Sequence, residues 1–148
     1  MIDFALSPEI KELRRKAKTF LDEQIIPNEG VLGQHDAESE ALMKDLQARV
    51  KSMGMWAMFI GPEAGGTGTG FLPYAFVNEI LGRSPYAPRA FGCQAPDTGY
   101  AEILHQFGTK EQKAEFLPGM ITGTHGLAFG LTEPNHGSDA ESAVPRRS

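Results

Sequence analysis

Apolar residues recur every three or four positions through most of the first 120 residues, and short segments rich in glycine or proline separate the periodic stretches. This spacing places apolar side chains on one face of a helix, so it restricts this region to amphipathic α-helices that pack against one another. The chain has 148 residues, which fits one compact domain with a sizeable core. We therefore expect a mainly α fold.

Start and stop signals divide the periodic region into five predicted helices. Ser7 and Pro8 start the first, because a hydroxyl caps free N–H groups and proline in the first turn leaves no N–H unpaired. Pro27 and Gly30 are expected to end it. Thr109, followed three residues later by a glutamine, has capping-box spacing. The predicted helices lie roughly at residues 8–26, 42–53, 73–81, 97–107 and 110–117.

Each predicted helix has an apolar side that should face a core. In the fourth helix Ala101, Leu104 and Phe107 are expected on that side. The opposite side of the first helix is basic and carries Lys11, Arg14, Arg15 and Lys18. A membrane surface or an acidic partner could account for this basic side, but a solvated face is favoured.

Two segments between the second and third predicted helices have no helical pattern. Residues 55–60 form a short apolar run that should be buried whatever its conformation. Residues 61–70 are rich in glycine, but they lack the lysine of a Walker loop and the glycine spacing of a Rossmann fingerprint. A flexible connector is therefore favoured over a nucleotide-binding loop.

Side chains that could bind a metal or act as nucleophiles are scattered. The histidines stand at positions 35, 105, 125 and 136, and no two have the spacing of a metal site. Cys93 has no adjacent base and is flanked by small and apolar residues. We expect no metal site, and a buried small cysteine in place of a nucleophile.

Charge and composition exclude several classes of function. The formal net charge of −5 argues against a nucleic-acid-binding surface. No apolar run approaches the about 20 residues that a membrane span needs, and the first residues do not resemble a secretory signal. A single cysteine fits a reducing compartment. The predicted location is cytoplasmic.

The pattern changes after Gly123. Residues 127–132 are short, apolar and punctuated by glycine, which favours a strand, and residues 133–139 form a polar, turn-rich loop. One strand is not a sheet, so the segment is either an extended tail or the start of a second domain, and the second is favoured. Its hydroxyls and free backbone groups suit a planar ligand with a phosphate, although the residues alone favour a plain surface turn.

Four motifs resemble the acyl-CoA dehydrogenase family. Phe129-Gly130-Leu131-Thr132-Glu133-Pro134-Asn135-His136-Gly137-Ser138-Asp139 resembles the family signature, in which a strand leads into Thr-Glu-Pro-x-x-Gly-Ser-Asp. Residues 62–68 resemble the glycine-rich loop of the family, and residues 108–113 resemble one of its helix starts. Residues 93–99 resemble a branch that acts on longer or modified acyl chains. The resemblance covers residues 1 to about 143.

This resemblance implies the N-terminal all-helical domain of the acyl-CoA dehydrogenase fold, with a short β segment at its C-terminal end. The helical domain would occupy residues 1–124, and residues 125–148 would begin an incomplete middle β domain. The last residues, 144–148, depart from the family and are expected to be frayed, as in a truncated chain. The same resemblance implies that complete members are more than twice as long and assemble as homo-oligomers.

The family reaction, in fatty-acid metabolism, is α,β-desaturation of an acyl-CoA thioester with hydride transfer to N5 of FAD. The resemblance implies that Phe129, Leu131 and Thr132 lie along the isoalloxazine, with Gly137 and Ser138 near the rest of the FAD. The same loop carries Glu133 and Asp139, which are expected to hold it in shape.

For the substrate, the resemblance implies that Ser138 approaches the pantetheine of CoA. Gln94, Ala95 and Thr98 match a segment near the acyl-chain tunnel. In most of the family the catalytic glutamate lies in a C-terminal bundle, and no acid of this chain matches it. We therefore assign no catalytic residue and expect a chain that carries only part of the FAD site and is inactive alone. The alternative is a non-enzymatic helical interaction module derived from the same scaffold.

Overall fold

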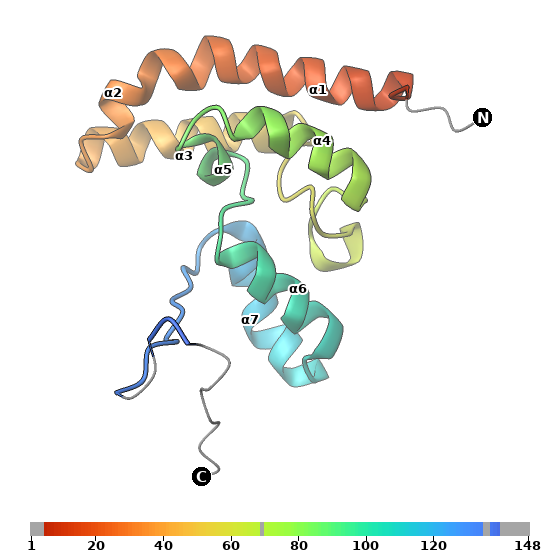
Figure 1. Ribbon diagram of the computed structural model, residues 1–148, viewed down its shortest axis with the longest axis vertical. Helices are drawn as coiled ribbons and strands as arrows, with labels where there is room; N and C mark the ends of the chain where they lie inside the picture. The colour runs from red at the N-terminus through yellow and green to blue at the C-terminus, as the bar shows by residue number, and fades with distance from the viewer. Residues whose placement is uncertain (1–4, 69, 135–136, 140–148) are drawn as a thin grey trace.

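The computed structural model describes residues 5–68, 70–134 and 137–139. It is mainly helical, as the sequence predicts (Figure 1). In chain order the elements are α1 (Pro8–Phe20), the π-helical turn η1 (Leu21–Ile25), the 3₁₀ turn η2 (Ile26–Asn28), α2 (Glu29–Leu32), α3 (Ala37–Ser52), the 3₁₀ turn η3 (Pro62–Ala64), α4 (Phe71–Leu81), α5 (Ala87–Ala90), α6 (Asp97–Phe107) and α7 (Lys110–Thr122).

The helices form two groups. The first five helices make a layer in which α1 lies along α4 and α3 contacts α5 (Figure 1). The second group is the pair α6 and α7, which extends away from that layer (Figure 1). Helix α7 contacts η3, and its last residues accept hydrogen bonds from Lys51 of α3 and from Trp56. The extended segment after α7 runs beside this pair.

The first helix begins as predicted, but its α-helical part, α1, ends at Phe20 and other helical turns follow it directly. The Ser7 hydroxyl accepts a hydrogen bond from the Ile10 N–H at 3.3 Å. The expectation that Pro27 and Gly30 end the helix is wrong, because helical turns continue to Leu32. Pro27 lies in the first turn of η2, where its missing N–H leaves no hydrogen bond unmade. A glycine such as Gly30 is tolerated within a short helix at modest cost.

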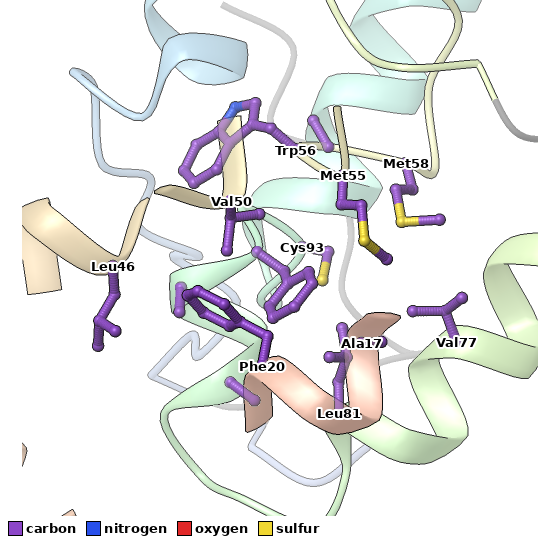
Figure 2. Close-up of a cluster of buried hydrophobic side chains, with 14 of the residues drawn as sticks. Ala17, Phe20, Leu46, Val50, Met55, Trp56, Met58, Val77, Leu81 and Cys93 are labelled. Atoms are coloured by element: carbon purple, nitrogen blue, oxygen red, sulfur yellow. The ribbon is translucent and has the colours of Figure 1, made fainter. Parts of the chain in front are cut away.

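The core lies between α1, α3, α4 and the 55–60 segment, whose side chains converge in Figure 2. Its largest fully buried side chains include Phe91, Leu21, Ile25, Met43, Leu46 and Met55. The rings of Phe20 and Phe91 meet edge to face, with centroids 5.8 Å apart. The predicted burial of residues 55–60 is confirmed, apart from a half-buried Phe59. Cys93 is also buried, as expected.

The glycine-rich connector is irregular except for η3, and backbone hydrogen bonds hold it in place. The N–H of Gly68 donates to the Ile60 carbonyl at 3.0 Å. Gly65 has a left-handed φ of 92° and ends η3. A Cβ on Gly66 would collide with the Ile60 carbonyl oxygen. Glycine is therefore required here by conformation and by close backbone approach. α4 starts at Phe71, two residues before the predicted start.

The second helix group matches its predicted start closely. The Thr109 hydroxyl accepts from the Gln112 N–H at 3.3 Å, and the Gln112 side chain accepts from the Thr109 N–H at 2.9 Å, which confirms the capping box. Helix α7 continues through Pro118 and ends at Gly123, whose φ is 77°. The expectation that Phe107 faces the core is wrong, because its side chain is 79% exposed.

The predicted strand at residues 127–132 does not form in the described part of the chain. These residues are extended and lie outside any sheet, and only Glu133 makes an isolated bridge. A strand needs a neighbour to share its backbone hydrogen bonds, and no described segment supplies a ladder for 127–132. Asn135, His136 and the predicted frayed end at 144–148 lie outside the described residues.

Candidate functional site

A pocket of about 340 Å³ lies at the start of α6. Three residues singled out from the sequence, Ala95, Thr98 and Phe129, line it together. The remaining lining residues are Pro96, Gly99, Tyr100 and Ile103. The pocket thus joins the segment before α6 to the extended segment after α7, which are about 30 positions apart in the sequence.

Aromatic side chains make one side of this pocket. The rings of Tyr100 and Phe129 meet with centroids 5.5 Å apart and an interplanar angle of 65°. Phe129 is nevertheless 61% exposed, so this contact covers only part of its ring. An exposed ring supported from one side presents a flat apolar surface to a further molecule.

Gln94 lies beside the pocket and does not line it. Its side-chain amide donates to an oxygen of Asp97 at 3.1 Å, and its backbone carbonyl accepts from the Thr98 N–H at 3.2 Å. Both partners belong to the first turn of α6. Gln94 therefore positions the start of the helix that carries the pocket.

A second pocket, of about 640 Å³, adjoins the first and shares Tyr100 and Ile103 with it. It lies between α6, α7 and residues 125–127. Much of its lining is apolar and open to solvent: Ile103 is 58% exposed, and Phe107 and Phe116 are also exposed. We call the surface formed by Tyr100, Ile103, Phe107, Phe116 and Phe129 the α6–α7 face.

Most of the α6–α7 face was not predicted from the sequence. Tyr100, Ile103 and Phe107 are spaced three and four residues apart, which is the spacing of a helix face. They form a second apolar face on α6, beside the one that carries the buried Ala101. Two apolar faces on one short helix were a signal that it contacts more than one neighbour.

The other predicted cofactor residues lie on the extended segment and not in either pocket. Leu131, Thr132, Gly137 and Ser138 are all exposed. Glu133 is half-buried, and Asp139 is exposed. An accessible edge that offers an aromatic ring, an aliphatic side chain and a hydroxyl fits a planar, hydrogen-bonding group such as a flavin. The predicted cofactor segment is therefore accessible to solvent.

Cys93 does not have the surroundings of a nucleophile. Burial raises the pKa of its thiol to about 12, and a hydrogen bond with Tyr74 offsets that rise in part. Burial also raises the pKa of the Tyr74 hydroxyl, helped by the neighbouring Cys93. Both groups are neutral near pH 7, so they serve packing and not covalent chemistry.

The described residues contain neither a cluster of metal-binding side chains nor a membrane-spanning helix. No group of three or more His, Cys, Asp or Glu side chains is placed to hold a metal ion among them. No helix in residues 5–68, 70–134 and 137–139 is long and apolar enough to cross a membrane.

This arrangement of helices, glycine loop and signature segment agrees with comparisons to known proteins. Residues 7–124 match the family described as acyl-CoA dehydrogenase, N-terminal domain. Because the match covers most of the chain, the chain belongs to the acyl-CoA dehydrogenase family. The resemblance inferred from the motifs is thereby confirmed.

Individual relatives show the same relationship. The chain is 34% identical to acyl-CoA dehydrogenase family member 10 of Mus musculus, covering 94% of this chain and 14% of that protein. It is 35% identical to a probable acyl-CoA dehydrogenase, FadE2, of Mycobacterium tuberculosis, covering 90% and 34%. A solved structure of a putative acyl-CoA dehydrogenase from Mycobacterium abscessus superposes with a TM-score of 0.78 at 32% identity, covering 95% of this chain and 38% of that one. The chain thus spans between 14% and 38% of the length of these relatives.

Proposed function

We propose that this chain forms part of the flavin and acyl-CoA site of an FAD-dependent acyl-CoA dehydrogenase. The observation that carries the proposal is the meeting of Ala95, Thr98 and Phe129 in one pocket. The first two are expected near the acyl chain and the third along the flavin. A flavin and an acyl group must lie side by side for hydride transfer, so residues of both kinds should converge.

On the substrate side, the pocket lining would contact the acyl chain. Ala95, Gly99 and Ile103 present small and apolar surface, and Thr98 adds a hydroxyl. Such a lining excludes water from an alkyl chain and limits its width. Ser138 would approach the pantetheine from the exposed loop.

On the cofactor side, the exposed edge at Phe129, Leu131 and Thr132 would lie against the isoalloxazine. The two apolar side chains would cover its ring system, and the Thr132 hydroxyl would hydrogen-bond to its pyrimidine side. Gly137 lets the backbone approach the rest of the FAD closely. Bound FAD supplies the hydride-accepting chemistry, while the protein orients the reactants and keeps water out.

The chain by itself is proposed to be inactive. By the resemblance, the glutamate that abstracts the proton lies in the C-terminal bundle of most family members. No acidic residue of this chain matches it. The α6–α7 face, with Ile103 and Phe107 exposed, also presents more apolar surface than a self-sufficient site needs. In the complete enzyme this face would be covered, the boundary between helical and β domains would fall at residues 124–125, and the assembly would be a cytoplasmic homo-oligomer.

A complementation experiment tests this function. The chain is mixed with a polypeptide that carries the remaining domains of a family member, and FAD absorbance is followed as acyl-CoA is added. We expect the chain alone to show no acyl-CoA-dependent bleaching and the mixture to show it. Phe129→Ala should reduce flavin binding in the mixture about tenfold or more, since an aromatic contact of about 1.5 kcal/mol is lost. Phe71→Ala removes another exposed phenylalanine, on α4, and is the control that should have no effect.

The outcomes separate the two functions. Stoichiometric FAD binding and bleaching by the chain alone would refute inactivity. Formation of a stable complex that never binds FAD would favour the non-enzymatic interaction module, for which the exposed α6–α7 face is the supporting observation. Equal effects of Phe129→Ala and Phe71→Ala would refute the proposed flavin contact.

A further inference from the structure

A third pocket lies on the other side of the α6–α7 pair. Its volume is about 820 Å³, and it is bounded by the glycine-rich connector, the C-terminal end of α3 and α7. It shares no lining residue with the two pockets of the α6–α7 face. The volume falls within the range of small-molecule sites, which is several hundred to about 1,000 Å³.

Interactions between distant segments hold the lining of this pocket in place. The indole N–H of Trp56 donates to the Ile121 carbonyl at 2.7 Å. The Lys51 ammonium donates to the Thr122 carbonyl at 3.0 Å and lies 4.2 Å from the centroid of the Trp56 ring. Glu63 and His105 approach to 3.3 Å across the mouth. The connector, α3, α6 and α7 are thus fixed relative to one another, so the pocket is preformed.

The lining combines an apolar floor with a positively charged edge. Trp56, Leu117 and Ile121 are buried side chains that form the floor. Lys51 and Lys113 lie at the edge, and Glu63 is the carboxylate that His105 pairs with. The pocket lining thus carries two positive side chains, Lys51 and Lys113, and one carboxylate, Glu63. It is locally positive although the whole chain has a formal charge of −5.

One polar atom in the pocket lacks a partner. The Thr67 hydroxyl oxygen is buried and has no hydrogen bond within the described part of the chain. Thr67 also lines the pocket. Because this oxygen has almost no exposed surface, it belongs to the wall of the pocket and is not available to a ligand in it.

From these observations we propose that this pocket binds a small monocarboxylate with an apolar body. The apolar body lies on Trp56, Leu117 and Ile121, and the carboxylate accepts a hydrogen bond from the Lys113 ammonium. A single negative charge matches the lysines better than a dianion does, because Glu63 lies in the same lining. This site is separate from the α6–α7 face and does not rest on the function proposed above.

The single tryptophan makes the proposal testable in the intact chain. Trp56 lines this pocket and neither of the other two, so its fluorescence reports on this site. We expect sodium octanoate to change Trp56 fluorescence saturably. Octanol has the same apolar body without the charge and should bind about tenfold more weakly, since a charged hydrogen bond is lost. Inorganic phosphate has no apolar body and should give no saturable change.

Variants locate the binding. Lys113→Gln should weaken octanoate binding about tenfold, whereas Lys110→Gln, on the same helix but outside the pocket, should not change it. Ala114→Phe fills the mouth from an exposed helical position and should abolish the fluorescence change while leaving the circular dichroism unaltered. Equal binding of octanoate and octanol, equal effects of the two lysine variants, saturation by phosphate, or unchanged binding in Ala114→Phe would each overturn the proposal.

Discussion

The layer of α1 to α5 and the α6–α7 pair use the same kind of residue in opposite ways. In the layer, the large aromatic side chains Phe20 and Phe91 are buried against each other. On α6 and α7, Phe107 and Phe116 have the same chemistry and remain exposed. The layer therefore resembles a completed core, whereas the pair resembles half of an interface.

Ion pairs join neighbouring elements within the layer of α1 to α5. The ion pairs Arg14–Glu79 at 2.7 Å and Arg83–Asp22 at 2.8 Å both join α1 or η1 to α4 and the turn after it. All four side chains are partly exposed, so they fix the orientation of the elements more than they stabilise the fold. On the basic side of α1, Lys11, Arg15 and Lys18 are exposed, as the sequence favoured. Arg14 differs, because it is half-buried and bonds to α4.

The sharpest test of this comparison removes one phenylalanine from each region. Phe91→Ala should destabilise the chain by about 3–5 kcal/mol, because it leaves a cavity in the core. Phe107→Ala should change the free energy of unfolding by less than about 0.5 kcal/mol, because this side chain is already in water. Urea denaturation followed by circular dichroism measures both. Equal losses in the two variants would show that the α6–α7 pair has a core of its own.

A smaller effect is expected from the buried thiol of the layer. Burial raises the pKa of Cys93 from 9.0 to about 12. The neutral thiol is favoured in the folded chain, so this contribution to stability is fully present below about pH 9 and is lost as the pH rises toward 12. Between pH 9 and 10.5 we expect a loss of about 2 kcal/mol that is absent in Cys93→Ala. Identical pH profiles for the two proteins would show that Cys93 is accessible to water in the native state.

The smallest effect concerns the start of α7. Thr109→Ala should cost about 1 kcal/mol by removing the capping box, whereas Thr109→Ser should keep most of it. Because α7 packs mainly on α6 and η3, we expect faster amide hydrogen exchange in α7 with little change in α1. If exchange in α1 accelerates equally, the two regions unfold as one unit and the comparison fails.

Local signals in the sequence predicted most helix boundaries well. Ser7 and Thr109 cap the helices that the sequence assigns to them, and α6 has the predicted bounds. These features depend on a few neighbouring residues, so no tertiary information is needed to find them. The predicted end at Pro27 was wrong because a proline interrupts a helix only where its backbone N–H would donate a hydrogen bond. In the first turn of η2 no such hydrogen bond is needed.

The candidate site was predictable only in part. Ala95, Thr98 and Phe129 could be named from motifs, but their meeting in one pocket depends on how the segment after α7 returns to the start of α6. Phe107 was assigned to the core because a helical period identifies apolar faces without saying which of them has a neighbour.

The sequence by itself determined the helical class, the caps and the family of this protein. Periodicity, capping residues and signature motifs each depend only on residues that are close together in the sequence. The tertiary structure decided which apolar residues are buried, where the pockets lie and that residues 127–132 remain unpaired in the described chain. The physical reason is that burial and strand pairing need a partner surface, and a partner is a property of the folded arrangement and not of any one segment.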